Sequence, residues 1–136
     1  MHIIICIDDN GGILFNGRRQ SQDRILREDI LRSAAGKRLL MNAYSKKQFG
    51  EADAAILADE QFLDKAGPGD CCFVENLPIA PYIDRVESIT VYKWNRVYPA
   101  DVYFDISLAT PEWRRIECTE FAGYSHEKIT KEVYVR

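Results

Sequence analysis

The residues that are best suited to bind a ligand lie between Lys37 and Phe49, in the segment KRLLMNAYSKKQF. Leu39 to Met41 form a short apolar run, which predicts one buried strand. Asn42 follows in a tight turn, and Ser45 is expected to open a helix because Gln48 stands at the capping-box spacing. The first amides of a helix have no partner inside it and carry partial positive charge. Asn42 and Ser45 are therefore candidates for an anion site, with simple helix capping as the alternative.

A second candidate is the segment from Gly17 to Arg24, GRRQSQDR, which is expected to be a surface loop with three arginines. The guanidinium groups of Arg18 and Arg19 suit phosphate or carboxylate recognition because each presents a fork of donors. Asp23 lies in the same segment and is expected to cap the helix that follows it. These three residues are ligand-binding candidates. The alternative is a solvated loop whose arginines pair with neighbouring aspartates.

Two further clusters carry weaker signals. Tyr92, Trp94 and Tyr98 alternate with cations and could stack bases, but aromatic packing on one face of a core strand is the favoured interpretation. His126 lies in the segment Tyr124-Ser125-His126-Glu127. As a general acid or base it would need a residue that fixes its tautomer and a nucleophile nearby. Neighbours in sequence rarely face one another, so the catalytic residues are unknown at this stage.

The composition limits the classes of function. A chain of 136 residues predicts a single domain over residues 1–136. Its net charge of -3 disfavours nucleic acid as a partner. The sequence has neither an apolar run that could span a bilayer nor a signal peptide, so we expect a cytoplasmic protein without a membrane partner. The four cysteines form no C-x-x-C pair, and we expect buried reduced thiols and no metal site.

Hydrophobic patterning predicts how these residues are positioned. Strands are expected at His2–Ile7, Leu39–Met41, Ala54–Ala58, Cys71–Val74, Glu87–Trp94, Trp113–Glu120 and Lys128–Val135, helices at Asp23–Ala35 and Pro78–Ile83, and loops at Asn16–Gln22 and Tyr98–Thr110. Strands that alternate with helices and end in two successive strands predict an α/β fold. Its sheet is expected to be mostly parallel with antiparallel C-terminal strands, with helices on both faces. An open sheet must protect its edges, so a homodimer through an edge strand is expected.

The order of these segments resembles the dihydrofolate reductase family over almost the whole chain. The segment DDNGGILFN is similar to the mobile loop after the family's first strand, and GKRLLMNAYSKKQF is similar to the strand and helix that carry phosphate contacts. FVENLPIAPYIDRVESITVYKW resembles the region of the family's paired glycines, and PADVYFDI and KEVYVR resemble its last loop and closing strand. The resemblance implies a single-domain reductase-like α/β fold, with NADPH as the cofactor to consider.

Three departures from the family bear on function. An ungapped count places Leu26 where the family's helix holds the carboxylate that binds the pterin ring, and leucine cannot pair with it. Glu75 and Asn76 match the family's glycine pair, where a carboxylate repels a pyrophosphate and a side chain blocks close approach. The family's glycine-arginine-x-threonine turn retains only the hydroxyl of Ser45. These departures disfavour both dihydrofolate reduction and NADPH.

The sequence leaves three functional hypotheses. The first is a module that binds a small phosphorylated or nucleotide-like ligand without reductase activity, at a site formed by Arg18, Arg19, Asp23, Asn42, Ser45, Glu75 and Asn76. The second is a diverged NAD(P)H-dependent reductase that acts on an unknown substrate. The third is a protein- or RNA-interaction module that uses the arginine loop and exposed tyrosines.

Overall fold

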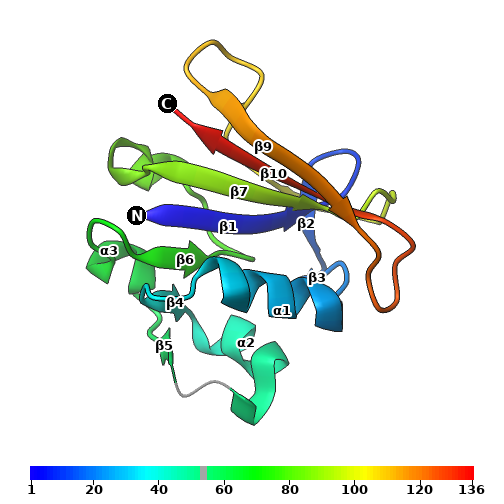
Figure 1. The fold of residues 1–136 in the computed structure, drawn as a ribbon, viewed down its shortest axis with the longest axis horizontal. Coiled ribbons are helices and arrows are strands. Elements are labelled where there is room, and N and C mark those ends of the chain that lie inside the picture. Colours follow the sequence, from blue (N-terminus) through cyan, green and yellow to red (C-terminus); the bar gives the residue numbers. More distant parts are fainter. Residues whose placement is uncertain (53–54) are drawn as a thin grey trace.

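The computed structural model describes residues 1–52 and 55–136. The sequence-predicted strand Ala54–Ala58 therefore begins outside the described residues. The centre of the fold is a seven-stranded sheet (Figure 1). In spatial order its strands are β5 (Ile56–Ala58), β4 (Leu39–Met41), β6 (Cys71–Phe73), β1 (His2–Ile7), β7 (Ser88–Lys93), β10 (Ile129–Val135) and β9 (Arg114–Phe121).

The first five strands of this order run parallel to one another, and the last two join the sheet through antiparallel pairs. β1 pairs in parallel with β6 and β7, and β4 pairs in parallel with β5 and β6. β10 runs antiparallel to both β7 and β9. The mostly parallel sheet with antiparallel C-terminal strands is thus confirmed. The carboxyl ends of the parallel strands meet at one edge, which is where open α/β sheets bind ligands.

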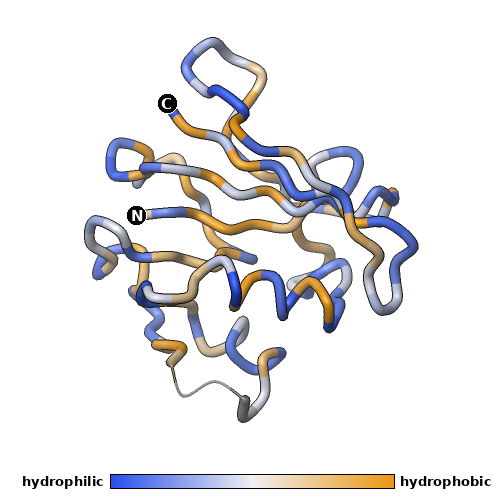
Figure 2. Tube along the Cα trace, viewed as in Figure 1, coloured by the Kyte–Doolittle hydropathy of each residue, from blue (hydrophilic) through white to orange (hydrophobic). Residues whose placement is uncertain are grey.

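Helices cover both faces of the sheet, as the alternation of apolar side chains along the strands requires. On one face, Ile4 and Met41 pack against Leu26 and Ile30 of α1 (Arg24–Ser33). On the other face, Ile3, Ile5 and Val91 pack with Phe62 of α3 (Phe62–Lys65). Figure 2 shows the apolar character of β1 and the mixed character of the C-terminal strands. The predicted two-sided covering is confirmed.

A small second sheet carries the arginine segment. Its order is β3 (Arg18–Arg19), β2 (Gly12–Phe15) and β8 (Val102–Tyr103). The predicted loops at 16–22 and 98–110 are therefore wrong in part, because each contains a two-residue strand. Such short strands leave no periodic pattern in a sequence. Their pairing with β2 fixes the backbone of both arginines beside the carboxyl ends of the main sheet.

Several local predictions need correction. Asn42, not Ser45, caps α2 (Ala43–Lys46), because the Asn42 side chain accepts from the backbone amide of Ser45. The helix expected at 78–83 is a 3-10 helix at Ala80–Arg85, and Lys47–Ala52 forms 3-10 turns that are interrupted by the non-helical backbone of Gly50. Cys118 is exposed on β9 rather than buried. Within residues 1–52 and 55–136, no helix combines the length and the apolar character that crossing a bilayer would take.

Candidate functional site

The carboxyl edge of the parallel strands carries four polar or aromatic residues directly after the strand ends. Asp8 follows β1, Asn42 follows β4, Glu75 lies just beyond β6, and Trp94 follows β7. All four have buried side chains. The edge that the sequence singled out is therefore packed rather than open, and its polar groups have partners within the protein.

Glu75 is the centre of the first cluster at this edge. Its carboxylate accepts from Nε of Arg19 at 2.9 Å and from Nη2 of Arg19 at 3.1 Å, which is a bidentate ion pair. The Ser45 hydroxyl donates to the same carboxylate at 2.8 Å. Burial opposes the charge of Arg19, but the hydrogen bonds and the charge of Glu75 outweigh it and raise the pKa of the guanidinium. The structure thus brings three of the predicted site residues together, bound to one another.

Tyr44 completes this cluster from the other side. Its ring centroid lies 4.3 Å from the Arg19 guanidinium carbon, and its hydroxyl accepts from the Arg19 backbone amide at 2.8 Å. Beneath the cluster, a cavity lined by residues that include Cys6, Ser21 and Trp94 has a volume of about 10 Å³. That is roughly the space one water molecule needs. The crevice at the carboxyl edge is therefore filled by the protein's own side chains.

Asn42 and Asn76 also bind within the protein. The Asn42 amide nitrogen donates to Oδ1 of Asn76 at 2.8 Å, while the Asn42 oxygen accepts from the Ser45 backbone amide at 3.0 Å. The backbone amide of Ala43 donates to a carboxylate oxygen of Glu60 at 2.8 Å. The start of α2 thus holds an anionic group, as its amides favour, but that group is a side chain of the same chain.

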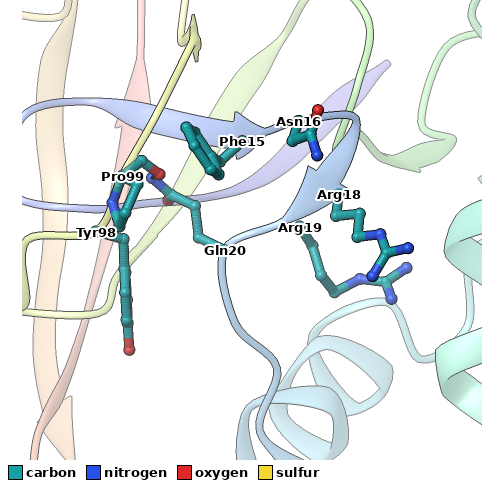
Figure 3. Close-up of a pocket in the computed structure, with 7 residues that line it drawn as sticks. All are labelled: Phe15, Asn16, Arg18, Arg19, Gln20, Tyr98 and Pro99. Atoms are coloured by element: carbon teal, nitrogen blue, oxygen red, sulfur yellow. Dashed lines mark hydrogen bonds between the residues drawn. The ribbon is translucent and has the colours of Figure 1, made fainter.

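An open pocket of about 280 Å³ lies next to the closed crevice. Figure 3 shows the side chains of Arg18 and Arg19 extending from β3 on one side of it. Phe15, Gln20, Tyr98 and Pro99 lie on the other side, and Asn16 completes the lining. We call this the outer pocket. Arg18 is exposed, and no ion pair of its guanidinium is found among the described residues.

Asp8 holds the wall of the outer pocket in place. Its buried carboxylate accepts from the backbone amides of Gly12 at 2.8 Å and Tyr98 at 3.1 Å, and from the Gln20 side chain at 3.1 Å. Burial opposes ionisation, but these hydrogen bonds prevail and lower the pKa of Asp8. Because the side-chain nitrogen of Gln20 donates to Asp8, the orientation of the Gln20 amide group is fixed. The carbonyl oxygen of Gln20 is buried, and it has no hydrogen-bond partner among the described residues.

Asp23 lies apart from the arginines and serves another contact. As predicted, it caps α1, accepting from the amides of Ile25 and Leu26. Its other oxygen accepts from Nδ1 of His126 at 2.9 Å. Burial works against ionisation, but the bond from His126 and several backbone amides hold the pKa of Asp23 far below its ordinary value. No local sequence pattern indicates this pair, because 103 residues separate its members.

The closed cluster and the outer pocket define what this edge can do. The outer pocket offers a free guanidinium and two aromatic rings, which suits a small anion with an attached ring or ribose. No group of three or more His, Cys, Asp or Glu side chains that could hold a metal ion occurs within residues 1–52 and 55–136.

Comparisons with known proteins identify the fold that this structure resembles. The sequence matches no family model and no curated protein. The structure is similar to that of dihydrofolate reductase from Enterococcus faecalis, solved as a complex with NADP(H) and RAB-propyl, with a TM-score of 0.69. The superposition covers 99% of this chain and 95% of that chain, at 12% sequence identity. The chain therefore has a diverged dihydrofolate reductase-like fold.

Proposed function

We propose that this protein binds a small phosphate-bearing ligand in the outer pocket and does not reduce dihydrofolate. The observation that carries the proposal is the exposed guanidinium of Arg18 at the rim of a 280 Å³ pocket, beside Arg19 and opposite two aromatic rings. Because Glu75 already neutralises Arg19, Arg18 supplies the net positive charge of the pocket. A volume just under the usual range for ligand pockets suits a compact ligand such as a nucleoside monophosphate.

The absence of reductase activity is the second half of the proposal. Leu26, at the position that the resemblance assigns to the pterin carboxylate, is buried in the core and 2% exposed. Glu75, which matches one of the family's paired glycines, is held in place by three hydrogen bonds. A pyrophosphate at that point would meet a fixed carboxylate, and the repulsion between like charges in a partly buried site is large.

Asn42 and Ser45 stay part of the predicted ligand set on one condition. Both have hydrogen-bond partners within the closed cluster, so a phosphate reaches them only if the Glu75 side chain moves away. The proposed primary contacts are therefore Arg18 and the outer face of Arg19.

A thermal-shift titration tests the proposal. The ligands are inorganic phosphate, pyrophosphate and adenosine monophosphate, with uncharged adenosine as the reference. At a concentration 100 times its Kd, a ligand stabilises the folded protein by about 2.7 kcal/mol, a shift of several degrees in melting temperature. Reduced nicotinamide dinucleotide and a short RNA belong in the same screen, since a shift with either would favour one of the alternative hypotheses instead.

Two variants make the titration specific. Arg18→Ala removes the free guanidinium and is expected to abolish the shift with anions. Arg114→Ala is the charge-matched control, because Arg114 is also exposed and lies at the start of β9, at the opposite end of the sheet. A shift that survives Arg18→Ala and disappears in Arg114→Ala, or no shift with any anion, would contradict the proposal.

A further inference from the structure

A serine, a histidine and an aspartate lie in line beside the closed crevice. Oδ2 of Asp23 is 2.9 Å from Nδ1 of His126, and Nε2 of the same ring is 2.9 Å from Oγ of Ser21. These contacts join the segment between β3 and α1 to the loop between β9 and β10. The order of contacts, carboxylate to imidazole to hydroxyl, is that of an activated serine nucleophile.

The surroundings fix the imidazole in the tautomer that this chemistry requires. The Asp23 carboxylate faces Nδ1 and can only accept, so Nδ1 carries the proton in the neutral imidazole and the Nε2 lone pair then faces Ser21. The Tyr98 hydroxyl also approaches Nε2, at the longer distance of 3.2 Å. The closer of the two hydroxyl groups is therefore the serine.

The carboxylate and the imidazole are both held rigidly. The side chain of Asp23 is 0% exposed and accepts from the backbone amides of Tyr124 and Ser125, at 3.0 and 2.9 Å. The Trp94 ring lies against the imidazole with 4.5 Å between centroids. Gly123 permits this packing, because a Cβ on it would lie 2.6 Å from Oδ2 of Asp23. Such fixed orientation is what makes a general base effective.

Ser21 itself is half-buried and lies outside any helix or strand. It lines the small cavity behind Glu75, and its neighbour Gln20 lines both that cavity and the outer pocket. That cavity has room for about one water molecule, so an acyl group of the size of acetyl reaches the hydroxyl only when the Gln20 side chain moves out of the wall that it shares with the outer pocket.

We propose that Ser21, His126 and Asp23 form a catalytic triad that hydrolyses small carboxylic esters. The Ser21 proton passes to Nε2 of His126 as Oγ bonds to the acyl carbon, and the same proton then passes to the leaving oxygen as the carbon–oxygen bond of the ester breaks. Water, the co-reactant, gives a proton to Nε2 and bonds to the acyl carbon. The Oγ–carbon bond then breaks, and the proton returns to Ser21. This inference uses atoms outside the proposed anion contacts and does not rest on the proposed function.

A second serine–histidine pair in the chain serves as a comparison for this triad. Nδ1 of His2 lies 2.6 Å from the hydroxyl of Ser88, at the amino ends of β1 and β7. No carboxylate hydrogen-bonds to the His2 ring among the described residues. Ser88 is thus a serine next to an imidazole that lacks the third group, and it is the matched control for Ser21.

The first experiment treats the unmodified protein with a fluorophosphonate, which bonds its phosphorus to a nucleophilic oxygen and releases fluoride and a proton. The proposal predicts one added phosphonyl group, located at Ser21 by mass spectrometry of the digested protein. It also predicts turnover of p-nitrophenyl acetate with an initial burst of p-nitrophenolate. A label at Ser88 or at no serine, or hydrolysis at the rate of buffer alone, would overturn the proposal.

The second experiment assigns the roles. Ser21→Ala is expected to reduce the hydrolysis rate at least about tenfold, while Ser88→Ala leaves it unchanged. Ser21→Cys, which restores a nucleophile at the same place, is expected to recover the burst. Equal rates in Ser21→Ala and the parent protein would contradict the role of the serine.

Asp23 is a positioning residue in this scheme, and its role has a spectroscopic signature. The proton on Nδ1 of His126, held by a buried carboxylate, is expected as a far-downfield proton resonance. Both Asp23→Asn and Gly123→Ala are expected to remove that resonance and to lower the hydrolysis rate. A variant that loses the resonance but hydrolyses the ester at the parent rate would exclude the triad.

Discussion

The ion pair between Arg19 and Glu75 allows a double-mutant cycle that tests whether the crevice is closed by mutual contacts. Removing Arg19 leaves the Glu75 carboxylate, only 9% exposed, with the Ser45 hydroxyl as its remaining partner. Breaking a buried pair in this way costs about 3–5 kcal/mol. Because the Arg19 side chain is 19% exposed, we expect the lower end, about 3 kcal/mol, for Arg19→Ala.

Replacement of the other partner, Glu75→Ala, is expected to reduce the free energy of unfolding by a smaller amount. In Glu75→Ala the guanidinium keeps the Tyr44 carbonyl, at 3.2 Å, and its stacking on the Tyr44 ring, so we expect a loss of about 2 kcal/mol. The double variant leaves neither charge unpaired. We therefore expect it to cost about 3 kcal/mol rather than the sum of the two, a coupling of about 2 kcal/mol.

Urea unfolding of the four proteins measures these free energies directly, provided that the m-values agree. Arg18→Ala is the control from the same strand. Its exposed side chain predicts a change within about 0.5 kcal/mol. If the two single losses add to within about 0.5 kcal/mol, the pair does not hold the crevice closed, and the reasoning is refuted.

Three further predictions follow from the same contacts. Stability is expected to fall as the pH drops below about 4, because the pKa of Asp23 is lower in the folded protein than its ordinary value of 3.8. The stabilisation from Asp23 is complete above that ordinary value and is lost as the pH falls through the folded-state value. Urea midpoints at pH 7, 5 and 3 should therefore fall more steeply in the parent protein than in Asp23→Asn. Gly12→Ala is expected to cost about 2 kcal/mol in urea unfolding, since its Cβ would lie 2.6 Å from Cβ of Ala100, and an unchanged midpoint would show that the loop yields freely. The homodimer stays a prediction: light scattering should give twice the chain mass, through the exposed edge strand β9, and Ile116→Lys should restore the single mass.

The sequence predicts the elements and caps that depend on a local pattern of residues. Runs of β-branched residues such as those in β1 and β7 predicted the long strands, and the position of Asp23 before an amphipathic stretch predicted the cap of α1. The same local reasoning placed the start of α2 wrongly. Asn42 and Ser45 both suit a capping position, and only the structure shows which side chain accepts the amide.

The contacts that decide the chemistry are long-range and left no local trace. The position of Glu75 predicts that it obstructs a pyrophosphate, but no pattern indicates its partner Arg19, which lies 56 residues away in the sequence. The sequence presents His126 as a candidate base without an identified partner, because Ser21 lies 105 residues away in a segment whose arginines and Asp23 are the predicted ligand-binding residues. Residues brought together by the order of strands in a sheet are not adjacent in any sequence pattern, so pairings of this kind need the fold.

The protein has a reductase-like sheet whose crevice is closed by its own side chains. The most direct measurement is an equilibrium titration with NADPH, followed by the fluorescence of Trp94, which lies at the end of β7 beside the closed cavity. The closed crevice predicts no saturable change in fluorescence up to millimolar NADPH. Saturable quenching at micromolar concentrations would contradict it and would favour a diverged NAD(P)H-dependent reductase.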